Sequence, residues 1–284
     1  MGRGQGEGEG HGGAPFKFIM NKALQRLENH LRRWPRAVLL FSGGLDSSLL
    51  LAAAARALGQ GLTAVTFTGP HIVPGELAAA YRLGRRLRVR HLVRALDPLA
   101  LPDFRQNTRR RCYACKRAVI EAGWKIASVQ GAEVLWDGTN LDDLADFRPG
   151  LAAARELGVG SPLLEAGLGK AAIRELSRAL GLPWQRPAQS CLATRFSYGA
   201  GLSAEALARM GQAEAWLRRR GFSHVRLRVS GAGARLELGP EEWQTFLAQG
   251  LRGPFGALVA CLEFGPLSLD LSADHGRVAP PPPA

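Results

Sequence analysis

The sequence has no apolar run long enough to cross a lipid bilayer, because glycine, arginine or proline interrupts every hydrophobic stretch. A secretory signal is missing as well, since the Gly-rich polar leader has no apolar centre behind a basic start. Cysteine is scarce, with four in 284 residues. We therefore expect a cytoplasmic protein without a membrane partner, whose thiols stay reduced and available for chemistry.

Lysine is also scarce, at five of the 37 basic residues, and arginine supplies the rest of a net charge of +13. A basic surface can bind nucleic acid. An arginine-rich, lysine-poor composition is equally typical of compositional bias in a genome, and the dense basic run at 82–94 would spread over a solvated face. We regard nucleic-acid binding as the less favoured interpretation.

What is present is ordinary globular composition, with 46% hydrophobic and 21% charged residues, which is enough for a sizeable core. Apolar runs and amphipathic stretches alternate along the first half. The pattern predicts helices at 16–33, 47–58, 76–88 and 113–129, and strands at 36–41, 62–69, 89–96 and 133–140. This order predicts an α/β domain, a parallel sheet with helices on both faces, whose ligands bind at the carboxyl ends of the strands.

The second half begins with helices near 149–157 and 169–180 and then changes character. We expect a helix at 203–220, strands at 224–230 and 234–239, a helix at 240–248 and a last strand at 257–264, which together make a small α+β C-terminal domain. The expected division is a disordered leader (1–15), the parallel-sheet domain (16–190), the small α+β domain (191–265) and a disordered tail (266–284).

The stretch FSGGLDSS (41–48) joins the first expected strand to the helix that follows it. Glycines allow close backbone approach, while the helix N-terminus and hydroxyl donors form an anion site. No lysine stands where a Walker A loop needs one. The alternative is a plain turn, but the full pattern favours a nucleotide site. Its candidate residues are Ser42, Gly43, Gly44, Asp46, Ser47 and Ser48, together with Asp137 and Asn140 at the end of the fourth strand.

This loop resembles the PP-loop of the ATP-pyrophosphatase (adenine nucleotide alpha-hydrolase-like) superfamily. The resemblance implies cleavage of ATP between the α and β phosphates, with AMP attached to a substrate oxygen and Mg²⁺ neutralising the leaving pyrophosphate. The blocks RCYACK (111–116), DGTNLDDLADFRPG (137–150) and SCLATRFSYG (190–199) sharpen it. Over residues 16–263 the chain looks like the ATP-dependent sacrificial sulfur transferase (LarE) family.

That resemblance implies a role in making the nickel-pincer nucleotide cofactor of lactate racemase. The implied substrate is pyridinium-3,5-biscarboxylic acid mononucleotide, one carboxylate of which is adenylated and then attacked by the family's cysteine, here Cys191. Cleavage of that cysteine's Cβ–S bond would give a thiocarboxylate and leave dehydroalanine. A nucleophilic cysteine needs nearby positive charge, which Arg195 would supply. A homo-oligomer is implied in the same way.

Other roles follow from the resemblance less directly. It places Glu214, Arg226 and Arg228 near a substrate phosphate, where strand alternation would put both arginines on one face. The alternative is a polar outer sheet face. Three further residues are expected to line the nucleotide site beside Asp137 and Asn140, namely Asp142, Asp143 and Arg148. After Glu263 the sequence departs from the family's usual ending.

The remaining cysteines leave alternatives open. Cys112 and Cys115 form a CxxC pair, which with Cys191 could hold a [4Fe–4S] cluster, as in iron–sulfur tRNA-thiolating enzymes of the same superfamily. We do not favour this interpretation, and a zinc site lacks paired histidines. Cys261, inside an apolar run, is expected to pack in the core. A further alternative is a nucleotide sensor that binds ATP without releasing pyrophosphate.

Overall fold

The computed structural model describes residues 14–145, 149–185 and 189–271. Its larger sheet has the order β3-β2-β1-β4, and every neighbouring pair is parallel. The strands are β1 (Ala37–Leu40), β2 (Leu62–Thr68), β3 (Arg90–Ala95) and β4 (Val134–Trp136). The four strands expected in this half are therefore confirmed, and the predicted parallel α/β sheet is correct.

Strand β1 is central because both of its faces are apolar. Val38 and Leu40 point into one core, whereas Ala37 and Leu39 point into the other, and all four residues are buried. Side chains alternate between the faces of a strand, so a continuous apolar run suits a strand that is covered on both sides. This places the residues that follow β1 at a rigid edge of the sheet.

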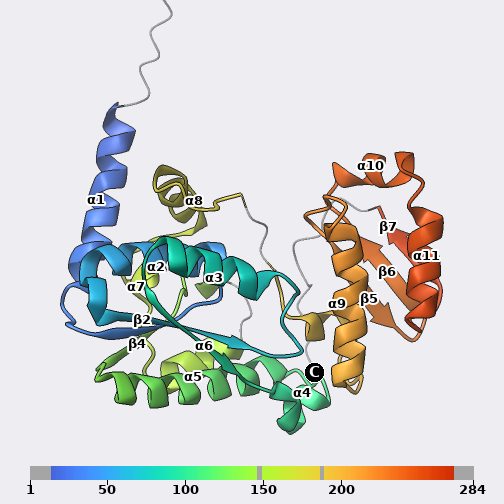
Figure 1. The fold of residues 1–284 in the computed structure, drawn as a ribbon, viewed down its shortest axis with the longest axis horizontal. Coiled ribbons are helices and arrows are strands. Elements are labelled where there is room, and N and C mark those ends of the chain that lie inside the picture. Colours follow the sequence, from blue (N-terminus) through green and yellow to red (C-terminus); the bar gives the residue numbers. More distant parts are fainter. Residues whose placement is uncertain (1–13, 146–148, 186–188, 272–284) are drawn as a thin grey trace, which may run out of the picture.

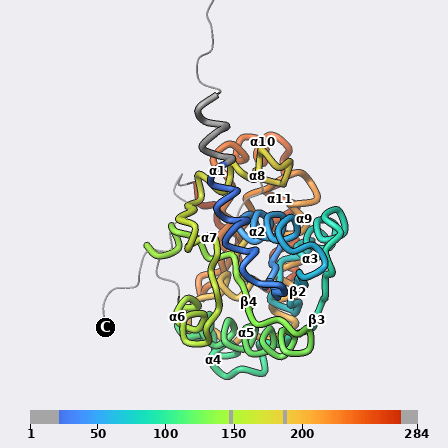
Figure 2. Tube along the Cα trace, turned by 90° about the vertical axis from the view of Figure 1, so that its left-hand side faces the viewer, coloured from blue at the N-terminus to red at the C-terminus, as the bar shows by residue number. Residues whose placement is uncertain are grey.

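Helices cover both faces of this sheet (Figure 1). On one face lie α2 (Leu45–Leu58) and α3 (Glu76–Arg86), and on the other lie α5 (Arg111–Gln130) and α6 (Pro149–Glu156). The side view in Figure 2 keeps α2 and α5 on opposite sides of the strands. Helices α1 (Ala14–Leu31) and α8 (Lys170–Ala179) pack on α2, and α4 (Pro102–Arg105) and α7 (Pro162–Glu165) are single turns.

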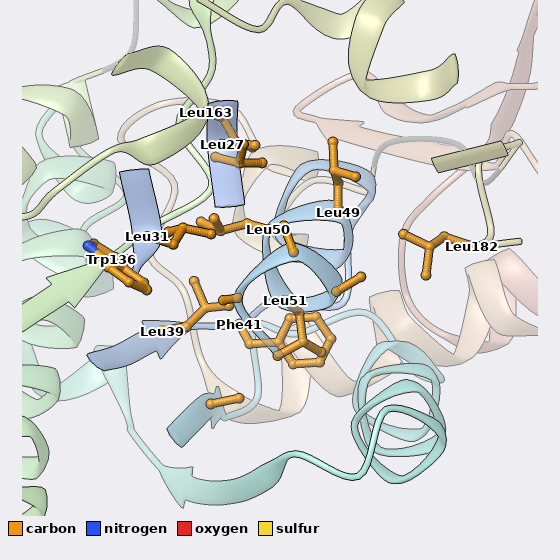
Figure 3. Close-up of a cluster of buried hydrophobic side chains, with 14 of the residues drawn as sticks. Leu27, Leu31, Leu39, Phe41, Leu49, Leu50, Leu51, Trp136, Leu163 and Leu182 are labelled. Carbon is orange, nitrogen blue, oxygen red and sulfur yellow. The ribbon is translucent and has the colours of Figure 1, made fainter. Parts of the chain in front are cut away.

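Helix α2 is surrounded by protein along its first half. The consecutive residues Leu49, Leu50 and Leu51 are all fully buried, and Figure 3 shows Leu50 toward Leu31 of α1 and Leu51 beside Phe41 after β1, while Leu49 points away from both. A helix that is apolar on every side has to lie in a core rather than on the surface. The glycine loop leads directly into this buried helix, so the packing of α2 fixes the position of the loop.

The second sheet, β5-β6-β7, lies with three helices on the right of Figure 1. Strands β5 (Arg226–Ser230) and β6 (Gly233–Glu237) form an antiparallel hairpin, and β7 (Leu267–Asp270) adds in parallel to β6. The helices are α9 (Ala204–Arg218), α10 (Glu242–Ala248) and α11 (Arg252–Cys261). Val73, Phe104 and Leu192 join the core of this group, so the two groups pack on each other.

Three expectations for the C-terminal part were wrong. Residues 257–261 of the run 257–264 lie in helix α11 and not in a strand, and the buried Phe255 and Val259 of this helix are spaced as on one helix face. Cys261 ends that helix on its outer side and is exposed, so it does not pack in the core. Leu267–Asp270, expected within a disordered tail, pairs with β6 as β7.

At the other end, α1 begins at Ala14, so the expected leader overlaps the first two residues of that helix. The rest of the leader and residues 272–284 of the tail lie outside the described residues. No helix within the described ranges is long and apolar enough to cross a membrane. The boundary expected near residue 190 stays a prediction.

Candidate active site

The glycine loop leaves the end of β1 and enters α2 in a tightly bonded turn. Gly43 has a φ of 79°, and a Cβ there would lie 3.0 Å from the Cβ of Ala80. The hydroxyl oxygens of Ser42 and Ser47 lie 3.0 Å apart, and Ser47 Oγ also donates to Gly44 O at 3.2 Å. Since the first amides of a helix lack intrahelical acceptors, this turn offers N–H and O–H donors to an anion.

Asp137, just after β4, is buried and paired with a lysine. Its Oδ2 accepts a hydrogen bond from Lys116 Nζ at 2.7 Å, while Oδ1 accepts from Thr139 N and Ser161 Oγ, each at 3.1 Å. Burial would raise the pKa of Asp137, but the Lys116 charge and these hydrogen bonds hold that pKa below its usual range. The carboxylate is therefore ionised and fixed at neutral pH.

The loop after β4 approaches the glycine loop closely. A Cβ on Gly138 would lie 2.9 Å from Ser47 N, so only glycine fits between the two segments. Asn140 is fully buried and caps the turn Leu141–Leu144, with its Oδ1 accepting from Asp142 N at 3.0 Å and its own N–H donating to Asp143 Oδ2 at 3.1 Å. Asn140 thus shapes this loop, and Arg148 lies outside the described residues.

Lys170, at the start of α8, is a second lysine beside these loops. Its Nζ lies 3.9 Å from Asp46 Oδ2 and 3.7 Å from Asp143 Oδ1, and its backbone N–H donates to Asp142 Oδ2 at 2.5 Å. The distances to Asp46 and Asp143 are long for hydrogen bonds. The ammonium therefore lies between two carboxylates at the edge of the glycine loop.

Cys191 lies at the start of a one-turn 3₁₀ helix, η4 (Leu192–Arg195). The carbonyl of His71 accepts from Leu192 N at 2.9 Å, which ties this segment to the loop after β2. Thr194 donates to the Cys191 carbonyl from both its backbone N, at 3.0 Å, and its Oγ1, at 2.7 Å. The backbone on both sides of the thiol is therefore fixed by hydrogen bonds.

The Cys191 thiol is protonated at neutral pH in this state of the site. Burial raises its pKa to about 11, against a backbone hydrogen bond from Ala193 and the charges of Arg111 and Arg195, which act to lower it. The side chain of Cys191 remains only partly buried. The charge of Arg195 therefore acts to lower the pKa of Cys191, as expected, but it does not offset the increase that burial causes.

Arg195 is engaged in a buried network rather than facing open space. Its Nη1 donates to Ser190 Oγ at 2.6 Å, and its Nε donates to Glu214 Oε1 at 2.6 Å. Glu214 is fully buried and also accepts from Arg218 Nη2 at 2.9 Å and from Leu227 N at 3.0 Å. Both oxygens of Glu214 are thus occupied by partners within the protein.

The two arginines of β5 lie on one face of that strand, with buried Leu227 between them on the other. Arg228 donates from Nε to Glu237 Oε1 at 3.0 Å and from Nη1 to Thr194 O at 2.9 Å. Burial, together with the charges of Arg195 and Arg228, lowers the pKa of Arg226. The alternation expected from the sequence is present, and a shared phosphate on these arginines stays a prediction.

One cavity of about 530 Å³ brings the glycine loop and the cysteines together. Of the residues expected at the site, the cavity is lined by Ser42, Gly44, Asp46, Ser47, Cys112, Cys115, Asp137, Asp143 and Cys191. Those that do not line it are Gly43, Ser48, Asn140, Asp142, Arg195, Glu214, Arg226 and Arg228. The cavity therefore joins two motifs that are separated by about 150 residues of sequence but lie at one edge of the sheet.

The three cysteines at the cavity influence one another. Burial raises the pKa of Cys115 to about 12, and the charges of Cys191 and Cys112 act in the same direction. Within the described parts of the chain, no group of three or more Cys, His, Asp or Glu side chains is arranged to hold a metal ion. A cluster on these thiols was the less favoured alternative, and it stays untested.

Several side chains that line the cavity are not among the candidates that the sequence offers. Lys116 and Arg111 flank the CxxC pair, in a block whose chemical signal is its two cysteines. His71 and Gln189 come from loops that carry no motif. Burial lowers the pKa of His71 to about 4, against the charge of Asp97, so its ring is neutral at pH 7. The signal for Lys116 was its place one turn after Cys112 on the same helix face.

No family model matches the chain, whereas several known proteins are similar to it over most of its length. It is 34% identical over 210 residues to the pyridinium-3,5-bisthiocarboxylic acid mononucleotide synthase of Lactiplantibacillus plantarum, covering 73% of this chain and 76% of that protein. The chain belongs to the LarE family. The resemblance seen in the sequence is thereby confirmed.

Other relatives share most of the chain with this LarE-family protein. An uncharacterized protein of Synechocystis is 38% identical over 230 residues, covering 81% of this chain and 86% of the relative. An uncharacterized protein of Methanocaldococcus jannaschii is 31% identical over 213 residues, covering 74% and 81%. Each of the three matches therefore covers more than two thirds of both chains.

Proposed function

We propose that the chain is an ATP-dependent sulfur transferase that acts in nickel-pincer cofactor biosynthesis. It would adenylate a carboxylate of pyridinium-3,5-biscarboxylic acid mononucleotide and donate the sulfur of Cys191. One observation carries the proposal: a single cavity of about 530 Å³ is lined by the glycine loop and by the Cys191 thiol. The printed name of the Lactiplantibacillus relative, a bisthiocarboxylic acid mononucleotide synthase, supports the same class of product.

The residues of the glycine loop are suited to bind a nucleoside triphosphate. The Ser42 and Ser47 hydroxyls and the first amides of α2 would hold phosphate oxygens at this end of the cavity. Mg²⁺ commonly binds through one or two carboxylates together with phosphates, and Asp46 is the carboxylate at the loop that would contribute. When bound there, the ion would neutralise charge on the departing pyrophosphate.

The first step transfers AMP. A substrate carboxylate oxygen bonds to the α phosphorus of ATP, the bond to the bridging oxygen breaks, and pyrophosphate leaves. The resulting acyl-adenylate has a good leaving group where the free carboxylate had none. Lys116 lines the cavity, and its ammonium, held by Asp137, would orient the anionic group beside the loop.

In the second step, Cys191 Sγ bonds to the acyl carbon and AMP leaves, which gives a thioester to the protein. The thiol proton has to leave first, since burial holds the Cys191 pKa at about 11. A base then removes the Cα proton of residue 191 and the Cβ–S bond breaks. The electron pair of that bond stays on sulfur, so the products are a thiocarboxylate and dehydroalanine.

A second candidate is an iron–sulfur-dependent tRNA-thiolating enzyme. The observation in its favour is that Cys112, Cys115 and Cys191 all line the cavity. The name of the Lactiplantibacillus relative favours the first candidate. The absorption spectrum of protein purified without oxygen separates the two, because a bound cluster is coloured.

Intact-protein mass spectrometry tests the proposal. After incubation with MgATP and the biscarboxylate nucleotide, we expect the chain to lose the mass of one H₂S, localised by peptide mapping to residue 191. The Cys191→Ala variant should bind ATP as before and transfer no sulfur, whereas Cys261→Ala, at an exposed position, should behave as wild type. Product formation with Cys191 unchanged would exclude the sacrificial mechanism. Binding of ATP without release of pyrophosphate would instead indicate the sensor alternative.

Assembly and location are further proposals. A homo-oligomer and a cytoplasmic location follow from the family and the composition, and sedimentation of the purified chain would test the first.

A further inference from the structure

The N-terminus of helix α5 concentrates positive charge at the cavity. Arg109, Arg110 and Arg111 follow one another where the helix begins, and its first turn contains no acidic residue. The N-terminal end of a helix already carries partial positive charge, so basic residues there are unfavourable and anions are favourable. A twenty-residue helix with three arginines at its start is therefore poised for a negative group.

Arg111 differs from its two neighbours because its side chain is buried. It is 6% exposed and lines the cavity beside Cys112 and Cys191, whereas Arg109 and Arg110 are exposed. Its Nε and Nη1 are buried with no hydrogen-bond partner among the described residues. Its guanidinium carbon lies 4.4 Å from the ring centre of Tyr198, which holds the planar group from one side.

The other buried arginine of the site shows what a satisfied guanidinium looks like here. Arg195 is bonded to Glu214, Ser190 and Thr194, so its charge and its N–H groups have partners. Among the described residues, Arg111 has the ring of Tyr198 and no carboxylate as a partner. A charge removed from water without a counter-ion is strongly unfavourable, and proteins keep such groups where a ligand completes them.

The position of Arg111 relative to Cys191 indicates what kind of ligand that is. Both residues line the same cavity, and Tyr198, which covers Arg111, belongs to the segment that carries Cys191. The glycine loop supplies donors for ATP phosphates from a different element, the N-terminus of α2. A second anion that has to reach Cys191 is the acidic molecule that receives the sulfur.

We infer that Arg111 and the first turn of α5 form an oxyanion site for a carboxylate or phosphate of the sulfur acceptor. This inference rests on the proposed function. The planar guanidinium matches the geometry of either group and can donate two parallel hydrogen bonds to it. The site fixes the acceptor with its reacting carboxylate between the glycine loop and the thiol.

The test uses nicotinic acid mononucleotide as the probe, a pyridinium that carries both a carboxylate and a phosphate. Its binding to the full chain is measured by calorimetry for wild type, Arg111→Met, Arg111→Lys and the control Arg109→Met. We expect about tenfold weaker binding or worse for Arg111→Met, an intermediate loss for Arg111→Lys, and little change for Arg109→Met, because Arg109 is exposed.

Two related probes separate the two groups. Nicotinamide mononucleotide lacks the carboxylate, and nicotinic acid riboside lacks the phosphate. If Arg111 holds the carboxylate, Arg111→Met weakens the riboside and leaves the amide unaffected. If it holds the phosphate, the reverse is expected. Either result supports the oxyanion site and names its ligand.

The thermal midpoint of the ligand-free protein distinguishes a binding role from a structural one. Removing a buried charge that has no partner should leave the midpoint of Arg111→Met unchanged or higher. A lower midpoint, or failure to fold, would mean that the protein itself uses the charge, and it would overturn the inference. Equal binding of the probe by wild type and Arg111→Met, or no binding by wild type, would overturn it too.

Failure of the proposed function would look different. Calorimetry of wild type with MgATP reports on the glycine loop, which Arg111 does not form. Absence of ATP binding would contradict the sulfur-transferase proposal, whatever the nucleotide probes show. Normal ATP binding with an unaffected probe would contradict only the role of Arg111.

Discussion

Arg195 Nε lies 2.6 Å from Glu214 Oε1, and both side chains are fully buried. The pair joins η4, which follows Cys191, to the middle of α9. Through Leu227 N, which donates to the same carboxylate oxygen at 3.0 Å, the connection continues to β5. The segment that presents the thiol is thus anchored in the core of the C-terminal group by one carboxylate.

Replacing Glu214 by Gln should destabilise the protein. The amide keeps the shape of the carboxylate but leaves the Arg195 and Arg218 charges without their partner, and breaking a buried ion pair in this way costs about 3 kcal/mol. Urea denaturation should show this loss, and sulfur transfer should slow. The control Glu205→Gln, at an exposed position of the same helix, should leave the free energy of unfolding nearly unchanged. Equal stability of the two variants would contradict the role given to Glu214.

Stability should fall in acid through Asp137. Its pKa is lowered in the folded protein, so its contribution is present above the unfolded-state pKa of about 4 and is lost as the pH falls through the folded pKa. Lys116→Met should lower the free energy of unfolding at pH 7 by about 2 kcal/mol, since a buried carboxylate loses its partner.

The difference between wild type and Lys116→Met should therefore shrink as urea denaturation is repeated at pH values from neutral toward 3. Lys125→Met removes an exposed lysine from the same helix and should shift stability by about 0.5 kcal/mol or less at every pH. A constant gap between wild type and Lys116→Met over the whole range would rule out coupling through the Asp137 charge.

The Cys191 thiol should react slowly with an alkylating reagent at neutral pH. Its pKa of about 11 means that the thiolate fraction, and with it the rate of reaction with iodoacetamide, rises about tenfold per pH unit up to that value. Exposed Cys112 and Cys261 should be modified first at pH 8. Peptide mapping after timed labelling gives the three rates separately. Labelling of Cys191 as fast as Cys261 at pH 8 would show that the thiol is not held in a low-polarity setting.

Gly43→Ala should distort the loop that is proposed to hold ATP. The φ of 79° is unfavourable by about 1–2 kcal/mol for a residue with a Cβ. The new methyl would also lie 3.0 Å from Ala80 Cβ. We expect about tenfold weaker ATP binding by calorimetry. Gly201→Ala, where a Cβ meets open space, is the matched control. ATP binding by Gly43→Ala equal to that of Gly201→Ala would remove this loop from the nucleotide site.

The sheet could be predicted from the sequence because its hydrophobic pattern fits only one kind of secondary structure. Val38 and Leu40 face one core and Ala37 and Leu39 the other, so an unbroken apolar run next to a glycine turn had to be a buried parallel strand. The pattern of the run 257–264 does not distinguish a helix from a strand, because a short apolar stretch occurs in buried helices as well as in strands. The segment is helical in the structure, where Phe255 and Val259 are buried on one side of α11.

For the site, sequence motifs could name the loops but not the contacts between them. The cavity does bring Ser42, Ser47 and Cys191 together, as their motifs suggested. Asn140 caps a turn with its side-chain oxygen, a contact that the sequence did not indicate, and its expected place at the nucleotide stays a prediction. The roles of Lys116 and Arg111 could not be assigned from the sequence. Lys116 pairs with Asp137, which follows a distant strand, and two nitrogens of Arg111 lack a partner among the described residues because of how distant loops pack around them.

The segment around Cys191 is held by backbone atoms and by side chains other than its own thiol. Leu192 N bonds to His71 O, and Asn107 Nδ2 donates to the carbonyls of Phe196 and Ser197. Under the proposed chemistry, a chain that has given up its sulfur would keep these bonds and its shape. Used and unused copies would then compete for the same nucleotide pool, and supply of the cofactor would be limited by the rate at which ribosomes replace exhausted copies.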